Sequence, residues 1–133
     1  MTDASAGLLD TSVVIDLDLL DSSRLPAAGA IAAVTLAELA AGPHTTEDAD
    51  ERARRQDRLQ WATATWDALP FDASTARAYG RVYAAARKRG RSSRSRLADL
   101  MIAATALANG LPLYTRNPAD FEAFGELVTV VAV

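Results

Sequence analysis

Three carboxylates occupy positions where a charged side chain needs a partner. Asp99 lies near the start of an almost uninterrupted apolar run, Leu97–Ala108. A helix that is apolar on every side is typical of a buried one, and a buried ionised group is costly unless it is paired or binds a metal. Asp10 ends the apolar run Gly7–Leu9, and Glu38 poses the same problem elsewhere in the chain. Together the three acids predict an acidic metal site.

Further oxygen donors follow later in the chain. Thr115, Asn117 and Asp120 come at or just after an apolar segment that predicts a strand. Several carboxylates within a few ångströms of one another cannot all stay ionised without a cation. Carboxylate, amide and hydroxyl oxygens are hard ligands, which suit Mg²⁺ or Mn²⁺ rather than zinc. Such a cation can activate water for in-line attack on a phosphodiester, so no covalent intermediate is expected.

These residues must be positioned by alternating strands and helices. We expect strands at Gly7–Asp10, Gly29–Val34, Leu111–Thr115 and Leu127–Val133, with a brief extended piece at Leu69–Phe71. Three of the expected helices follow a capping signal: Val13–Leu20 after Thr11-Ser12, a short helix that begins with a Thr35–Glu38 capping box and ends at Gly42-Pro43, and Ala73–Arg89 after Asp72. We also expect a long helix over Thr45–Trp66, the apolar helix that ends at Asn109-Gly110, and a helical turn at Pro118–Phe124. This alternation predicts an α/β fold with a parallel sheet covered on both faces. Ligands bind such sheets beyond the carboxyl ends of the strands, so we expect the acids to converge at that edge.

Length and composition set the broad class. The chain has 133 residues, which predicts one domain over 1–133, and 50% of them are hydrophobic while 23% are charged, as in globular proteins. It has no cysteine, which excludes disulfides and thiolate metal sites and fits a reducing compartment. No signal peptide or membrane span is apparent, so a cytoplasmic protein is expected. The net charge of −3 argues against bulk electrostatic binding to nucleic acid but allows a local basic face.

One stretch is strongly basic, and it runs from Arg87 to Arg96. The dipole of the preceding helix explains its first three cations, but it does not explain Arg91, Arg94 and Arg96. These three lead into the helix that carries Asp99, so we interpret them as a phosphate-binding rim.

Other chemistry-bearing residues receive plainer interpretations. The arginines that include Arg54 and Arg58 are interspersed with acids and indicate a solvated helix face. Trp61 and Trp66 could stack on bases, but helical aromatic residues are more often core or dimer contacts, and we assign both to that role. The only histidine, His44, lies in a Gly-Pro turn and is interpreted as a loop residue.

Each acid also has a structural explanation. Asp99 could be an acid in the first helical turn that is satisfied by the helix dipole. Glu38 could complete the capping box with Thr35, a role that conflicts with metal ligation. Asp16 is interpreted as a solvated acid or as one that supports the metal ligands. Haloacid-dehalogenase-like phosphatases also place an Asp after the first strand, but they need a second acid where this chain has Ser12.

Three segments, in order and spacing, resemble the PIN-domain ribonucleases, and specifically the VapC-type toxins. These segments are Leu8–Asp16, Val34–Leu39, and Leu97–Ala106 with its continuation through Gly110–Phe121. The resemblance covers essentially the whole chain and implies a three-layer α/β/α PIN-like domain with a mainly parallel central sheet.

The resemblance also implies site residues. Asp10, Glu38 and Asp99 correspond to the acidic metal-binding residues of the family. Many members carry a further Asp where this chain has Asn117, and here Asp120 follows three residues later; either could be the fourth ligand. Three hydroxyl residues would support these ligands, Thr11 or Ser12 at the first carboxylate and Thr115 near the fourth position.

The family's activity is Mg²⁺- or Mn²⁺-dependent endonucleolytic cleavage of RNA, often of a structured RNA such as tRNA or rRNA. The resemblance therefore implies the toxin of a type II toxin–antitoxin system, a homodimer, and a small antitoxin whose C-terminal tail blocks the acidic pocket. The Asn117 departure from the family pattern keeps one alternative open, a catalytically silent module that only binds RNA or a partner.

Overall fold

The sheet of the protein is entirely parallel in the computed structural model, which describes residues 6–90 and 96–133. Its strands are β1 (Ala6–Leu9), β2 (Ala28–Ala32), β3 (Ala68–Leu69), β4 (Leu113–Thr115) and β5 (Val130–Ala132). They lie in the order β3-β2-β1-β4-β5, and each neighbouring pair is parallel. The chain leaves β1 toward β2 on one side and returns to β4 on the other. The carboxyl end of β1 is therefore a topological switch point, the place where ligands bind in such sheets.

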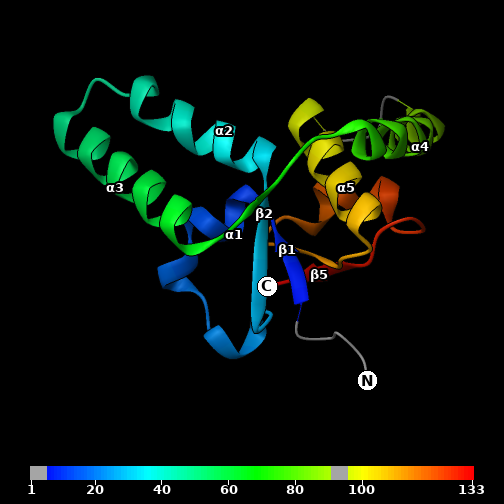
Figure 1. Ribbon diagram of the computed structural model, residues 1–133, viewed down its shortest axis with the longest axis horizontal. Coiled ribbons are helices and arrows are strands. Elements are labelled where there is room, and N and C mark those ends of the chain that lie inside the picture. The colour runs from blue at the N-terminus through cyan, green and yellow to red at the C-terminus, as the bar shows by residue number, and fades with distance from the viewer. Residues whose placement is uncertain (1–5, 91–95) are drawn as a thin grey trace.

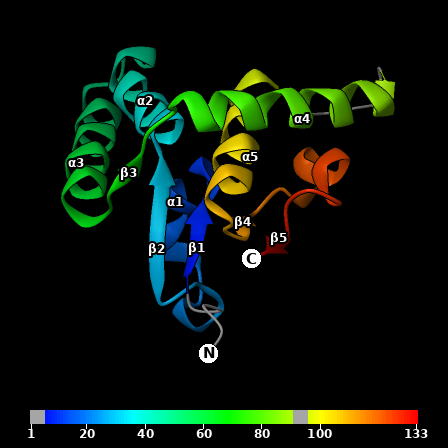
Figure 2. The same ribbon diagram turned by 45° about the vertical axis from the view of Figure 1, so that its right-hand side comes forward.

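Helices connect the strands and cover both faces of the sheet. They are α1 (Thr11–Ile15), α2 (Ala33–Ala41), α3 (Ala49–Thr65), α4 (Ala73–Arg89) and α5 (Leu97–Asn109). Short 3₁₀ helices occur at Leu17–Leu19, Ser22–Arg24, Gly42–Thr45 and, as η5, at Pro118–Phe124. Figures 1 and 2 show the α2–α3 pair on one side of the sheet and α4 with α5 on the other.

Two hydrophobic cores lie on opposite faces because successive strand residues point to opposite sides. Leu8 of β1 packs in a core with α4, α5 and η5, whereas the next residue, Leu9, packs with α1, α2 and α3. Leu113 and Tyr114 of β4 divide in the same way. The predicted three-layer α/β/α fold with a parallel sheet is thus confirmed.

Local signals fixed some boundaries well. Asp72 caps α4, since its carboxylate accepts from the Thr75 backbone N–H at 3.0 Å, and the helix covers the predicted residues. Gly110 ends α5 with a φ of +63°, a conformation that glycine adopts without a steric cost. The helical turn at Pro118–Phe124 is also confirmed, as a 3₁₀ helix.

Other predicted boundaries were wrong. The helix expected over Val13–Leu20 is only the short α1, with a separate 3₁₀ turn after Asp16. The helix expected from Thr45 begins at Ala49, because Asp48 accepts hydrogen bonds from the backbone N–H groups of the first turn. The strands expected at Gly29–Val34, Leu111–Thr115 and Leu127–Val133 are shorter than predicted. Within the described residues, no helix combines the length and apolar character that crossing a bilayer requires.

Candidate metal and active site

Asp10 is a buried acid that several hydrogen bonds hold in place. It follows β1, caps α1 and is 4% exposed. Its Oδ1 accepts hydrogen bonds from Ser12 Oγ at 2.6 Å and from the Val13 backbone N–H at 3.1 Å. Its Oδ2 accepts from Thr115 Oγ1 at 2.5 Å. Burial raises the pKa of Asp10, and the hydrogen bonds from Ser12 and Thr115 oppose that rise.

The segment after β4 is joined to α1 around the same carboxylate. Thr115 Oγ1, which donates to Asp10, accepts from the Asn117 backbone N–H at 2.9 Å. The Arg116 backbone N–H donates to Ser12 Oγ at 3.1 Å, and the Arg116 guanidinium pairs with Asp16 at 3.0 Å. Thr115 therefore contacts the first carboxylate directly as well as the backbone at the expected fourth position. Arg116 was missed by sequence reasoning, although its place directly after a strand-end threonine was a usable signal.

Glu38 is exposed on α2 and contacts α1. Thr11 Oγ1 donates to Glu38 Oε1 at 2.5 Å, and the same hydroxyl oxygen lies 3.1 Å from Thr35 Oγ1. The predicted capping box is wrong, because α2 already begins at Ala33 and Thr35 lies inside the helix, fully buried. The Glu38 carboxylate is thus not used for helix capping. Thr11, predicted as a possible anchor for Asp10, contacts Glu38.

Asp99 combines a role at a helix terminus with a place beside other acids. Its Oδ2 accepts from the Arg96 backbone N–H at 3.1 Å, at the start of α5. Burial raises the pKa of Asp99. The hydrogen bond from Arg96 opposes the rise, whereas the negative charges of Asp120 and Glu38 add to it. Three acids from distant parts of the sequence therefore influence one another here.

A single pocket of about 210 Å³ at the carboxyl edge of the sheet brings the predicted residues together. It is lined by Asp10, Thr11, Ser12, Ile15, Glu38, Arg96, Asp99, Ile102, Asn117 and Asp120. Both candidates for the fourth ligand thus face the same space. The apolar pair Ile15 and Ile102 was not predicted, because periodicity alone assigns such residues to the core.

The donors fit a hard divalent cation. The pocket offers carboxylate and amide oxygens, and the pKa of Asp99 is raised first by burial and then by the negative charges of Asp120 and Glu38. In residues 6–90 and 96–133, however, no group of three Asp, Glu, His or Cys side chains stands close enough together to form a ready-made cation site. The chemistry of the donors suits Mg²⁺ or Mn²⁺, and the side chains would have to close around the ion.

The structure supports some of the remaining sequence predictions and contradicts others. Arg96 lines the pocket, whereas Arg91 and Arg94 lie outside the described residues. Trp61 was assigned to the core or a dimer contact; it is not a core residue, since 47% of its surface is exposed, and the dimer contact stays a prediction. Trp66 is partly buried against the α1–α3 core. His44 lies in a 3₁₀ helix after α2, and it is not among the residues that line the acidic pocket.

The fold and the pocket define the class of protein, a three-layer α/β protein with acids gathered at the switch point of a parallel sheet. Comparison with known proteins identifies the family within that class. The model of the PIN domain family matches residues 7–127. The chain is 37% identical over 132 residues to ribonuclease VapC5 of Mycobacterium tuberculosis, across 97% of this chain and 95% of that protein. It is 32% identical over 130 residues to VapC ribonuclease Y4jK of Sinorhizobium fredii, across 89% and 91% of the two chains.

Solved structures agree with these relatives. The crystal structure of VapBC-5, a toxin–antitoxin system of Mycobacterium tuberculosis, matches with a TM-score of 0.86, covering 97% of this chain and 99% of that one. The protein therefore belongs to the PIN domain family, in which VapC ribonucleases are its relatives. The family assignment removes the phosphatase alternative.

Proposed function

We propose that this chain is a VapC-type endoribonuclease, the toxin of a type II toxin–antitoxin system, and that it hydrolyses RNA phosphodiester bonds with the help of Mg²⁺ or Mn²⁺. The observation that carries the proposal is the pocket where Asp10, Glu38, Asp99 and Asp120 converge in a PIN fold. The ribonuclease names of two relatives that match nearly the whole chain support the same activity.

The residues would divide the work according to their environments. Asp10, fixed by Ser12 and Thr115, is the rigid ligand, and Asp99 faces it from the start of α5. Glu38 would supply a third carboxylate. We assign the fourth to Asp120, because its charge already acts on Asp99, and leave the Asn117 amide oxygen as an auxiliary donor.

A bound divalent cation would supply stabilisation of phosphate charge and activation of water. The protein would contribute the remaining features. Arg96 at the pocket rim would pair with a backbone phosphate, and Ile15 and Ile102 would limit the access of bulk water to the reacting phosphate. Thr11 would keep Glu38 directed at the pocket through its hydrogen bond.

The proposed partners follow from the relatives. Two of the matching structures are a VapBC toxin–antitoxin system of Mycobacterium tuberculosis and a toxin–antitoxin complex of Klebsiella pneumoniae, so we propose a small cognate antitoxin that covers the pocket, and a homodimer of this chain. The proposed substrate is a cellular RNA such as tRNA or rRNA, which would place the reaction in the cytoplasm.

The test is cleavage of a total small-RNA pool by the purified protein, separated on gels, with Mg²⁺, Mn²⁺ or EDTA. Wild type is compared with Asp99→Asn and with Asp67→Asn, a matched substitution of an exposed acid outside the pocket. We expect discrete fragments that require metal, persist with Asp67→Asn and fall at least about 100-fold with Asp99→Asn.

Two results would contradict the proposal. Cleavage that survives both EDTA and Asp99→Asn would place the activity elsewhere or in a contaminant. Metal-independent RNA binding without turnover, the same in wild type and Asp99→Asn, would favour the silent binding module that the Asn117 departure kept open.

A further inference from the structure

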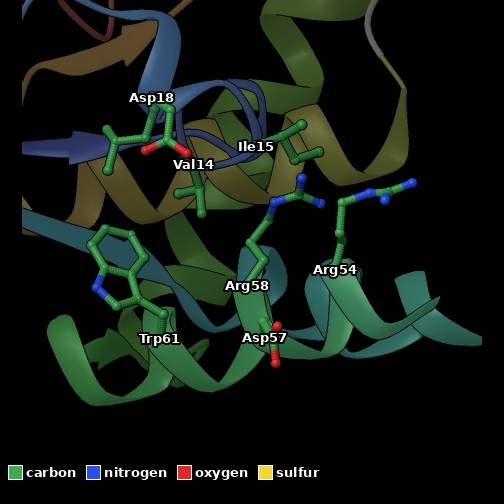
Figure 3. Close-up of a pocket in the computed structure, with 8 residues that line it drawn as sticks. Val14, Ile15, Asp18, Arg54, Asp57, Arg58 and Trp61 are labelled. Atoms are coloured by element: carbon green, nitrogen blue, oxygen red, sulfur yellow. The ribbon is translucent and has the colours of Figure 1, made fainter. Parts of the chain in front are cut away.

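A second depression lies between α1 and α3 and shares Ile15 with the acidic pocket. We call it the α1–α3 groove; it is lined by Val14, Ile15, Leu17, Asp18, Arg54, Asp57, Arg58 and Trp61 (Figure 3). A connecting hollow shares Thr11, Ile15 and Glu38 with the acidic pocket, and Ile15 and Arg58 with the groove. The three hollows therefore adjoin one another between the acids and Trp61, and we call them together the path.

Among the described residues that line the groove and the connecting hollow, Arg58 is the cation that the fold leaves available. Arg54 and Arg55 both pair with Glu51, each at 2.8 Å. Across the part of the chain that the structure describes, Arg58 has no ion-pair partner. Its side chain extends from α3 toward Ile15 (Figure 3). A guanidinium in this position can bind a phosphate through two hydrogen bonds.

Trp61 lies farther along the same helix and presents aromatic surface to the groove. Its ring contacts Trp66 edge-on, with centroids 5.0 Å apart and planes at 80°. This contact orients the indole, while 47% of the residue stays exposed. An oriented, exposed aromatic ring beside a cation is the arrangement that proteins use to stack unpaired bases along a strand.

Building on the proposed function, we propose that the α1–α3 groove binds the single-stranded RNA segment next to the cleaved phosphate. Arg58 contacts a backbone phosphate, and Trp61 stacks on a base. The base must be unpaired, because a base inside a duplex has no free face. The groove would thus select loops or single strands and hold the neighbouring phosphate at the acids. The apolar residues of the groove also suit a peptide. We favour RNA because Arg58, which has no ion-pair partner among the described residues, lies near the proposed site of phosphodiester cleavage.

Equilibrium binding tests the groove apart from catalysis. All variants are made in the full-length Asp99→Asn protein, with EDTA present, and binding of a fluorescent single-stranded RNA of about 12 nucleotides is followed by anisotropy. Trp61→Ala should weaken binding about tenfold or more, whereas Trp61→Phe should stay within about threefold of the parent protein, because it keeps a stacking face.

The contribution of Arg58 can be measured separately, from how RNA binding depends on salt concentration. The logarithm of the binding constant falls as the logarithm of the salt concentration rises. Losing one phosphate contact to a single strand makes this slope shallower by about 0.7. We expect this reduction for Arg58→Ala but not for Arg58→Lys, which keeps the charge. The control is Arg77→Ala on α4, an exposed arginine that lines neither the groove nor the acidic pocket. With Asp99 restored, the Trp61 and Arg58 variants should raise KM for RNA and leave kcat within about twofold.

The outcomes separate this inference from the proposed function. Suppose that wild type cleaves RNA in a metal-dependent way. If both Ala variants then bind RNA as the Asp99→Asn parent does and, with Asp99 restored, cleave it as wild type does, the groove is not an RNA site. If those variants lose only a co-purifying protein partner, the groove binds a peptide and the inference is wrong. If the binding pattern holds but wild type never cleaves, the groove stands and the nuclease proposal fails. If Trp61→Ala does not fold, the Arg58→Ala variant still tests the groove, because it changes a side chain at the surface.

Discussion

At the residue scale, the Asp99 carboxylate has two roles. It accepts a backbone hydrogen bond at the start of α5 while it faces Asp120 and Glu38 across the pocket. Without a cation, desolvation and like charge both disfavour its ionised form, so the pKa of Asp99 lies above its ordinary value of 3.8. The folded protein is therefore destabilised by a charge that the proposed cation would neutralise.

This raised pKa gives a stability prediction with a definite sign. Between the unfolded and the folded pKa of Asp99, the folded state holds the proton more tightly, so stability falls as pH rises through that window and the penalty is complete above it. In metal-free buffer at pH 7, Asp99→Asn should therefore melt at a higher temperature than wild type. The asparagine oxygen can still accept from the Arg96 N–H.

Thermal melts from pH 7 down to pH 4 check this sign. The advantage of Asp99→Asn should shrink as the pH falls, because wild type then becomes protonated at this site. Asp67→Asn, the exposed control, should show no such trend. An Asp99→Asn protein that melts below wild type at pH 7 would mean that the hydrogen bond at the helix terminus outweighs the electrostatic penalty.

At the scale of elements, the position of the first carboxylate depends on the contact between α1 and the end of β4. Thr115 is fully buried, and its hydroxyl donates to Asp10 across 105 positions of sequence. The partly exposed Arg116–Asp16 ion pair joins the same two elements, although such pairs contribute little to stability. The hydroxyl is thus the more important link.

Removing that hydroxyl should affect both the fold and the site. Thr115→Val keeps the shape but leaves Asp10 Oδ2 without its donor, so we expect a loss of about 1–3 kcal/mol in the free energy of unfolding and a 10- to 100-fold lower affinity for Mn²⁺. Thr115→Ser keeps the hydroxyl and should retain most of both. Denaturant unfolding and Mn²⁺ titration measure the two effects. Equal metal affinity in the Val and Ser variants would show that Thr115 only packs.

The sequence predicted those elements whose ends carry their own signals. Asp72 before α4 and Gly110 after α5 are local cues, and both predictions are confirmed. The start of α2 was wrong because its cap, Ala32, makes no side-chain hydrogen bond, and Thr35 offered a misleading alternative. Likewise, α1 is too short for a periodic pattern to define its end.

At the scale of the whole molecule, the strand order assembles the pocket. With β1 between β2 and β4, Asp10 lies between Glu38, which follows β2, and Asp120, which follows β4. That these acids would meet at the carboxyl edge was predictable, because parallel strands end together. The links of Thr115 to Asp10 and of Arg116 to Asp16 were not, since they depend on β1 and β4 being neighbours, which no local pattern encodes.

The same topology extends the site beyond the acids. The α2–α3 pair places Arg58 and Trp61 along a path from the pocket, on the sheet face that α1 also covers. From the sequence, the arginines of α3 were interpreted as a solvated helix face and Trp61 as a core or dimer contact. The groove could not be predicted, because only the fold shows that α3 faces α1. The proposed RNA-binding groove and the acidic pocket would thus adjoin each other.

The most direct test of the central claim, that these acids form one divalent-cation site, is Mn²⁺ binding to the full chain followed by electron paramagnetic resonance. Wild type and Asp67→Asn should take up Mn²⁺ with equal affinity, and Asp99→Asn should bind at least about tenfold more weakly. Equal binding by all three proteins would contradict the account, since the ion would then lie away from the pocket that Asp10 and Asp99 define.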